Sequence, residues 1–268
     1  MPKKIIAANW KMAPASLSEA QEILERTDEY LGTLDERKEF TLIFFPPFVF
    51  LEEVAKYLGT SHLAHQALLG AEDIATEDSG ALTGEVSGPM LQKLGVRYVI
   101  IGHSERRWKI GESDEVVNKK LKAALRNELI PIVCIGERTR DFSAKGGPAS
   151  GWKDFLKNQI AATFVGLTPD DLGKCIVAYE PVWAISSNSG AHPDTPESAL
   201  ESISVIKETL SNIYNLKPKT CFMYGGSVNS GNVRSFLAED EVDGVLIGGA
   251  SVNKDEFVKI LSVVREII

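Results

Sequence analysis

The chain has 268 residues and is 44% hydrophobic, which supplies a sizeable core and suits one α/β barrel or two smaller domains. Its formal net charge of −8 argues against nucleic acid and anionic membrane as partners, and no window approaches the run of about 18 to 20 apolar residues that a membrane span needs. Three cysteines without paired spacing, and an N-terminus without a secretory signal, predict reduced thiols and a cytoplasmic location.

Strand-like and helix-like patterns alternate along the whole chain. Short apolar runs predict strands at Lys4–Asn9, Thr41–Phe45, His62–Gln66, Tyr98–Gly102, Pro131–Gly136, Cys175–Glu180, Thr220–Tyr224 and Gly244–Gly248. Eight β/α repeats in about 250 residues predict a closed (β/α)8 TIM barrel, eight parallel strands ringed by helices, as a single domain over residues 1–268. An open doubly wound sheet is the alternative, but it normally has a glycine-rich turn after its first strand, and Asn9-Trp10-Lys11-Met12 has no glycine.

Several helix starts are marked by capping residues. Ser16 and Glu19 form a capping-box pattern before the first helix. Thr195 and Pro196 are typical of an N-cap followed by a first-turn proline, and Asn253 begins the last helix. Apolar positions at helical spacing follow each of these starts, which supports the alternation of strands with helices.

Polar residues follow the predicted strands at their carboxyl ends. In a barrel these ends meet on one face, and that face carries the chemistry. The residues that would converge there are Asn9, Lys11, His103, Glu105, Glu180, Ser227 and the turns Gly225-Gly226 and Gly248-Gly249. Glycine turns that lead into helices expose backbone N–H groups where the helix dipole favours an anion, although a tight turn is the commoner reason for paired glycines.

Glu180 leaves an apolar strand and is followed at once by Pro181, which forces an extended conformation. A carboxylate in that position is poorly solvated, so we expect its pKa to be raised, as suits a general base. The alternative is a strand-end carboxylate in a surface salt bridge. The small polar residues of Ser186–Pro193 predict a lid over the base.

The other polar residues have a chemical and a structural interpretation each. Lys11 can neutralise a phosphate or an oxyanion, or be a solvated loop lysine. His103 lies near a helix start that favours a neutral, hydrogen-bond-donating imidazole, although a lone histidine is more often structural. Glu105 is expected to position Lys11 or nearby backbone, and Ser227 to bind phosphate or to cap the following helix.

No metal or cofactor site is expected. His62 and His65 share one predicted strand at an odd separation, so they would point to opposite faces and could not share a metal. His192 lies in a predicted loop, where we expect it to be exposed and unbound.

Five segments resemble motifs of the triosephosphate isomerase family, in that family's order. They are Asn9–Met12, Ile101–Arg107, Ala178–Ala184, Tyr224–Val228 and Leu246–Ser251. The resemblance extends from about Ile5 to the final helix. It implies an isomerase that interconverts dihydroxyacetone phosphate and D-glyceraldehyde 3-phosphate through an enediolate, without a metal or cofactor.

The resemblance also implies a role for each site residue. Glu180 would remove a proton from the carbon beside the carbonyl and return it to the neighbouring carbon. Neutral His103 would act as the electrophile and exchange protons with the two oxygens, a pairing established in that family. Lys11 would stabilise negative charge, and Asn9 would help to place the substrate. Phosphate would be bound by the closed lid and by the turns, at Ser186, Ser227, Gly248 and Gly249.

Two further segments resemble the lid hinge and the subunit-contact loop of proteins in that family. Pro181-Val182-Trp183 resembles the lid hinge, and Tyr224 resembles its partner in the closed state. Thr83 lies at the tip of Gly80–Glu85, which resembles a loop that reaches into a neighbouring subunit and predicts a homodimer. Gln66 matches a glutamine at that interface.

Two departures from the family pattern leave alternatives open. The lid, Ser186–Asp194, is longer than is usual in the family and lacks its lysine, and Ser186 stands where the family has a glycine. Ala67 stands where the family commonly has asparagine. The changed lid leaves open a longer ketose phosphate, such as a tetrulose phosphate, as the substrate. A phosphate-binding barrel without catalysis is the other alternative, although retention of all three reactive residues weighs against it.

Overall fold

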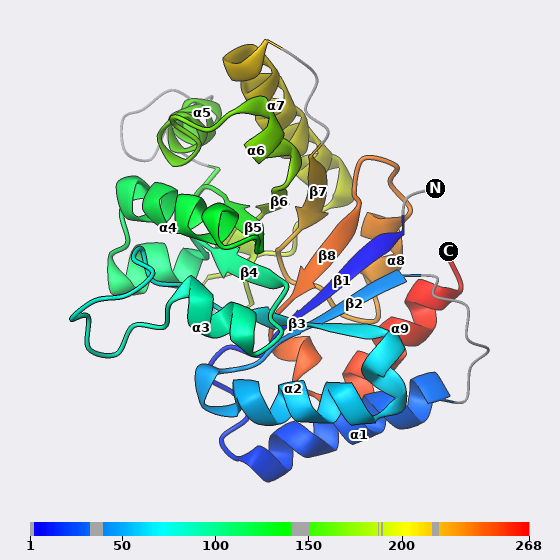
Figure 1. Cartoon of the computed structure of the whole chain (residues 1–268). Helices are drawn as coiled ribbons and strands as arrows, with labels where there is room; N and C mark the ends of the chain where they lie inside the picture. Colours follow the sequence, from blue (N-terminus) through cyan, green and yellow to red (C-terminus); the bar gives the residue numbers. More distant parts are fainter. Residues whose placement is uncertain are drawn as a thin grey trace.

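The apolar runs of the chain form parallel strands that close into a barrel. The computed structural model describes residues 3–32, 40–140, 151–186, 188, 190–215 and 220–267. Within these residues the strands are β1 (Lys4–Asn9), β2 (Phe40–Phe45), β3 (Ala67–Ala71), β4 (Tyr98–Ile101), β5 (Ile130–Ile135), β6 (Ile176–Tyr179), β7 (Cys221–Tyr224) and β8 (Gly244–Ile247). Each pairs in parallel with the next, and β8 pairs back to β1, so the sheet closes on itself (Figure 1). The predicted (β/α)8 barrel is confirmed.

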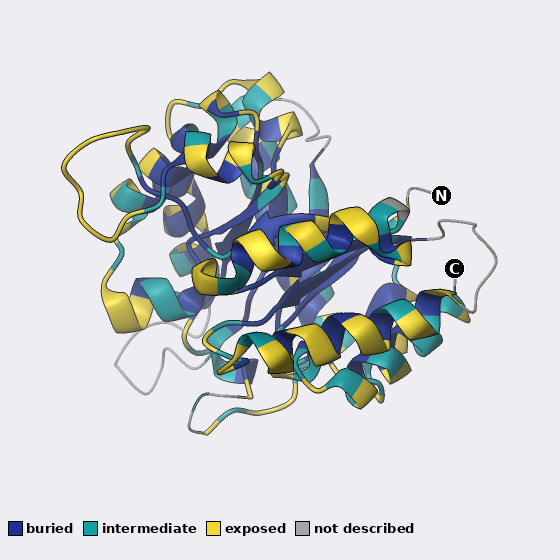
Figure 2. Ribbon diagram, turned by 60° about the horizontal axis from the view of Figure 1, so that its bottom comes forward, coloured by how far each residue is buried: buried dark blue, intermediate teal, exposed yellow. Residues whose placement is uncertain are grey.

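Helices cover the outside of the barrel and connect successive strands. Those in the described residues are α1 (Leu17–Gly32), α2 (Leu51–Thr60), α3 (Gly88–Lys93), α4 (Asp114–Arg126), α5 (Gly151–Thr163), α6 (Pro169–Gly173), α7 (Pro196–Tyr214), α8 (Val233–Leu237) and α9 (Lys254–Arg265). Figure 2 shows that their buried residues face the strands while exposed residues cover the outer side. None of the described helices is both long and apolar enough to cross a membrane.

The predicted capping residues begin their helices. The Ser16 hydroxyl accepts the N–H of Glu19 at 3.3 Å, while the Glu19 carboxylate accepts the N–H of Ala15 at 3.0 Å. At α7 and α9, the side chains of Thr195 and Asn253 accept the N–H three residues further on, at 3.3 and 3.1 Å. These caps satisfy backbone donors that helix starts otherwise leave unpaired.

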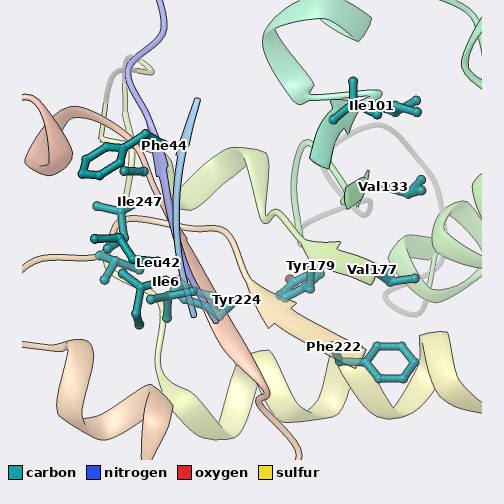
Figure 3. Packing of buried hydrophobic residues seen from close by; sticks show 14 of the residues in the cluster. Ile6, Leu42, Phe44, Ile101, Val133, Val177, Tyr179, Phe222, Tyr224 and Ile247 are labelled. Atoms are coloured by element: carbon teal, nitrogen blue, oxygen red, sulfur yellow. The ribbon is translucent and has the colours of Figure 1, made fainter. Parts of the chain in front are cut away.

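Alternate side chains of each strand lie on opposite sides of the barrel wall. One set packs against the helices, and its members labelled in Figure 3 are Ile6, Leu42, Phe44, Ile101, Val133, Val177, Tyr179, Phe222, Tyr224 and Ile247. The other set fills the barrel with a separate core, made of Ile5, Ala7, Ile43, Phe45, Ile100, Ile132, Cys134, Ile176, Ala178, Met223 and Leu246. Both sets are apolar, as expected for parallel strands that are buried on both faces.

The third strand differs from the prediction. His62–His65 form a 3-10 turn rather than a strand. Ser61 stabilises the turn, because its hydroxyl accepts the N–H of Leu63 at 3.2 Å. The strand follows this turn and runs from Ala67 to Ala71. The predicted strand at His62–Gln66 is therefore wrong, because the strand begins only after this range.

This shift changes the interpretation of nearby residues. His62 and His65 belong to a turn, so the alternation argument about their faces does not apply. Among the described residues no three His, Cys, Asp or Glu side chains are grouped as a metal site would require. Gln66 precedes β3 and lies at its amino end, whereas the loop with Thr83 leaves the carboxyl end. Gln66 therefore lies away from the strand end that leads to this loop, and its place at a dimer interface stays a prediction.

Candidate active site

The carboxyl ends of the strands surround a cavity of about 340 Å³. Its lining includes most of the residues that were predicted to converge: Asn9, Lys11, His103, Glu180, Ser186, Gly225, Gly226, Ser227, Gly248 and Gly249. Glu105 lines a neighbouring cavity. The other predicted residues do not line the active-site cavity: Pro181, Val182, Trp183, Tyr224 and Thr83. Segments that are far apart in the sequence are thus brought to one mouth of the barrel.

Strand alternation directs the site side chains inward. Asn9 continues the inward series of β1 after Ala7, and Glu180 continues that of β6 after Ala178. Both are buried, with 5% and 2% of their surface exposed. The apolar pattern of these strands therefore also determines which strand-end side chains face the cavity.

Lys11 is held in an unusual backbone conformation beside the turn after β8. Its φ is 59°, in the left-handed region that residues other than glycine rarely adopt, and the Asn9 side chain accepts its N–H at 3.2 Å. Its Nζ lies 3.0 Å from Oε1 of Glu105. A Cβ at Gly248 would lie 3.2 Å from Cε of Lys11, so the absence of a side chain there leaves room for the lysine. These contacts together orient one amine toward the cavity.

His103 lies between the backbone of the turn after β4 and Glu180. The backbone N–H of Glu105 donates to its Nδ1 at 3.3 Å, so we assign the imidazole proton to Nε2. The Glu105 carboxylate lies 3.6 Å from Nδ1, beyond normal hydrogen-bond distance. Nε2 lies 2.9 Å from Oε1 of Glu180. The imidazole N–H therefore points at the carboxylate across the floor of the cavity.

Glu180 accepts hydrogen bonds from two neighbouring residues of the turn after β4. The Ser104 backbone N–H donates to Oε2 at 2.9 Å, and the Ser104 hydroxyl donates to Oε1 at 2.9 Å. Together with the Nε2–H of His103, three donors satisfy a carboxylate that is almost fully buried. The carboxylate is therefore firmly held by these donors.

These donors reverse the predicted direction of the pKa shift. Burial by itself raises the pKa of Glu180, but the contacts of His103, the Ser104 N–H and the charge of Lys11 outweigh burial and leave the pKa below its usual value. The prediction of a raised pKa is wrong for this arrangement, because it considered the apolar strand and not the donors of another strand. Glu180 is an ionised carboxylate that must release these donors before it can accept a proton elsewhere.

The predicted hinge is attached to a second buried carboxylate. Trp183 Nε1 donates to Oε1 of Glu137 at 2.9 Å, and the Val182 N–H donates to the Glu137 backbone carbonyl at 3.0 Å. The His192 N–H donates to the Trp183 carbonyl at 3.1 Å, which joins the two ends of the lid. Residues 187 and 189 of the predicted lid lie outside the described residues.

The lid segment also contacts the turn after β7. The Ser186 N–H donates to the Ser227 hydroxyl at 2.8 Å. Tyr224 stacks on Phe236 with ring centroids 3.8 Å apart, and its hydroxyl bonds the carboxylate of Asp194 at the far end of the lid. Burial and this carboxylate raise the pKa of Tyr224, so the phenol remains protonated.

Three site residues were missed from the sequence. Ser104 follows His103 at a helix start, a position that indicates a backbone donor but not its acceptor. Glu137 is the second residue after β5, so a strand-end signal was present and not used. Arg140 lies a few residues further along, and nothing in the sequence indicates that it packs against the hinge.

The closed barrel, with a carboxylate, an imidazole and an amine grouped at its carboxyl-terminal mouth, defines a (β/α)8-barrel enzyme. The family model described as triosephosphate isomerase matches residues 4–264. The triosephosphate isomerase of Caldanaerobacter subterraneus subsp. tengcongensis is 40% identical over 98% of this chain and 100% of its own length. That of Moorella thermoacetica is 40% identical over 98% and 99%. The crystal structure of triosephosphate isomerase from Bartonella henselae superimposes with a TM-score of 0.77 at 31% identity, covering 98% of this chain and 99% of that one.

The chain therefore belongs to the triosephosphate isomerase family, and it is an isomerase. The resemblance of the five motifs is confirmed at the level of the family. The matches extend over nearly the whole chain, so they include every strand and every residue of the candidate site.

Proposed function

We propose that this chain interconverts dihydroxyacetone phosphate and D-glyceraldehyde 3-phosphate, with Glu180 as the base and neutral His103 as the electrophile. The observation that carries this proposal is the contact of 2.9 Å between His103 Nε2 and Glu180 Oε1 beside the amine of Lys11. Membership of the family supports the reaction type. A base, a hydrogen-bond donor and a cation are the groups that enolisation of a carbonyl compound requires.

The mechanism begins when substrate displaces the resting contacts of Glu180. Freed from the donors of Ser104, the carboxylate takes a proton from the carbon beside the carbonyl. The C–H electron pair becomes the carbon–carbon double bond of an enediolate, and the carbonyl oxygen takes the negative charge. His103 donates its Nε2 proton to that oxygen and takes one from the neighbouring oxygen, while Lys11 lowers the energy of the charge. Glu180 then returns its proton to the other carbon.

The phosphate group is proposed to bind at the turns after β7 and β8. Gly248 and Gly249 line the cavity there, with Ser227 on one side and the Ser186 amide of the lid on the other. Backbone N–H groups and Lys11 supply the local positive potential that a dianion needs on a chain with a net charge of −8. Asn9 is proposed to place the substrate through its amide, which is buried beside Lys11.

The assay is the conversion of glyceraldehyde 3-phosphate, followed with a reductase that consumes the ketose product, and repeated with four-carbon phosphates. We expect turnover of the triose. Turnover of a tetrulose phosphate alone would move the substrate to the longer sugar, and binding without turnover would identify a phosphate-binding barrel. Glu180→Gln should lower kcat by about 100- to 10,000-fold. An unchanged rate in that variant would refute the assigned base.

We also infer a homodimer in which the loop with Thr83 reaches the partner near Lys11. Thr83 is exposed on the long loop between β3 and α3, which projects from the barrel in Figure 1. Next to the active-site cavity lies another of about 430 Å³, lined in part by Met12 and Ile110, which are 98% and 64% exposed. Exposed apolar side chains around a cavity favour a protein partner. Sedimentation should show a dimer that Met12→Asp dissociates, and a monomeric wild type would contradict this assembly.

A cytoplasmic location stays a prediction. Its support is that Cys134, Cys175 and Cys221 are free thiols in the structure. Fractionation of cells that produce the protein, followed by immunodetection, tests it directly.

A further inference from the structure

Arg140 packs beneath the lid hinge, just beyond the carboxyl end of β5. Its guanidinium lies 3.8 Å from the ring centroid of Trp152 on α5 and 5.8 Å from that of Trp183 in the hinge. Stacking on indole rings is a favourable environment for a guanidinium, and the planar group is held there with one orientation. The cation is thus fixed against a side chain that belongs to the lid.

The same guanidinium is paired with Glu137. Nε of Arg140 lies 3.0 Å from Oε1 of Glu137, and this oxygen also accepts Trp183 Nε1–H and the Tyr179 hydroxyl, each at 2.9 Å. Glu137 is fully buried, with 0% of its surface exposed. A buried carboxylate that lost its cation would be expected to take up a proton.

Arg140 also contacts the element that follows the lid. Its Nη2 donates to the Ser198 carbonyl at 2.9 Å and to the Ser202 hydroxyl at 2.7 Å, both in the first turns of α7. Because α7 begins directly after the lid, Arg140 joins the amino-terminal hinge to the carboxyl-terminal attachment of the same segment. A change in this side chain therefore affects both ends of the lid at once.

We propose that Arg140 is a positioning residue of the isomerase, which keeps Glu137 ionised and thereby holds the Trp183 indole in the orientation from which the lid moves. This inference rests on the proposed function, since it requires a lid that closes over substrate. An ionised acceptor binds an indole N–H about twice as strongly as a neutral one does. A hinge attached to a neutral Glu137 would be less well ordered and would close less accurately.

The charges around Glu137 determine the direction of the pH effect. Burial raises the pKa of Glu137, and the Trp183 N–H and Arg140 oppose that rise. The other charged groups nearby belong to different elements: Glu201 on α7 lies 3.7 Å from Arg140 Nη1, and Lys153 on α5 pairs with Glu201 at 2.7 Å. Asp194 faces Arg140 from the lid. Removal of Arg140 raises the pKa of Glu137 further, so the order of the hinge would become sensitive to pH at higher pH than in the wild type.

The test compares Arg140→Met with Arg140→Lys, and uses Lys153→Met as the matched control. Lys153 packs over the same Trp152 ring, with Nζ 5.1 Å from its centroid, and no contact of its side chain with Glu137 is seen in the described residues. kcat and KM for the triose phosphate are measured from mildly acidic to mildly alkaline pH. Release of inorganic phosphate per turnover is measured in parallel, because a poorly closed lid exposes the enediolate to elimination.

We expect Arg140→Met to lower kcat about tenfold at mildly acidic pH, where Glu137 takes up a proton and its charged hydrogen bond with Trp183 is lost, with recovery as pH rises. Phosphate release per turnover should increase in the same range. Arg140→Lys should restore most of the loss, and Lys153→Met should follow the wild-type profile. The double variant Arg140→Met with Glu137→Gln should lose the added pH dependence, since no carboxyl group is left to titrate.

A wild-type pH profile and phosphate release in Arg140→Met would overturn the inference, as would an equal loss at every pH. If Arg140→Met does not fold, as judged by circular dichroism, Arg140→Gln replaces it as the variant without the cation, and Arg140→Lys remains the variant that keeps the charge. Absence of isomerase activity in the wild type would instead refute the proposed function. The two failures are therefore distinguishable.

Discussion

Removal of the Ser104 hydroxyl should make Glu180 a stronger base in the free enzyme. The hydroxyl donates to Oε1 at 2.9 Å. His103, the backbone N–H of Ser104 and Lys11 lower the pKa of this carboxyl below its usual value, and the hydroxyl is a further donor to the same group. In Ser104→Ala the backbone N–H and His103 remain, so one donor is lost and the geometry is otherwise kept. Glu180 is only 2% exposed, and water cannot replace the missing donor easily.

The size of the effect follows from the strength of one charged hydrogen bond. Such bonds contribute about 1.5 to 3 kcal/mol, and one pKa unit corresponds to about 1.4 kcal/mol. Loss of the hydroxyl should therefore weaken the hold on the ionised carboxylate by about that free energy and raise the pKa of Glu180. Because the folded-state pKa is lowered, ionised Glu180 stabilises the fold above its unfolded pKa, and this stability is lost as pH falls through the folded pKa. In the variant, ionised Glu180 should stabilise the fold less, and the acid loss should be smaller and complete at a higher pH.

The assay is the pH dependence of kcat/KM, whose acidic limb reports the essential base of the free enzyme. The limb should move to higher pH in Ser104→Ala, and thermal melts should show lower stability at neutral pH with a smaller fall on acidification than in the wild type. Ser235→Ala is the control, since its hydroxyl bonds only the Asn232 carbonyl at 2.8 Å among the contacts seen in the described residues. A limb that stays in place, or moves to lower pH, would refute the account of the Glu180 pKa.

Other predictions test the packing and the buried ionisable groups. A Cβ at Gly136 would lie 1.8 Å from the Glu180 carbonyl oxygen, so Gly136→Ala should displace the base, lower activity and cost about 1 to 3 kcal/mol in urea unfolding; wild-type behaviour in both would contradict the close approach. Burial raises the pKa of Glu72 to about 8. The stability of the fold should therefore decrease as pH rises from the ordinary pKa of a glutamate to that value. Melting temperatures across this range should show the decrease, and Glu72→Gln should abolish it. Burial raises the pKa of Cys175 to about 12 and that of Cys134 also, so thiol reagents should label the half-buried third cysteine first; early labelling of either buried thiol would be inconsistent.

The barrel could be predicted from the sequence because its signals are local. Apolar runs, caps and the spacing of repeats are properties of neighbouring residues, and they identified seven of the strands to within a few residues. The third strand was missed because close packing against β2 determines its residues, and strand propensity does not. A Cβ at Gly70 would come within 2.2 Å of the Phe45 ring on β2, so small residues are needed where strand propensity favours large ones.

The candidate site likewise contains residues that local sequence predicts and contacts that it does not predict. Strand-end residues such as Asn9 and Glu180 could be named, because the alternation of an apolar strand fixes the side on which its last residue lies. The environment of Glu180 could not be predicted, because Ser104 is 76 positions away in the chain and contacts it only once the barrel closes. The contact of Arg140 with the hinge depends on three separate elements and has no local sequence signal.

The contact between the Ser186 amide and the Ser227 hydroxyl limits how tightly the proposed phosphate site can hold an anion. The amide is already satisfied at 2.8 Å, so an arriving phosphate oxygen replaces one partner by another and gains only their difference. Calorimetric titration with a phosphate analogue should accordingly give a more favourable enthalpy in Ser227→Ala, where the amide has no internal acceptor to leave. A variant that binds a phosphate inhibitor more tightly, or releases product more slowly, would therefore be obtained by weakening the hydrogen bond between Ser186 and Ser227. Adding donors to the cavity would not be required.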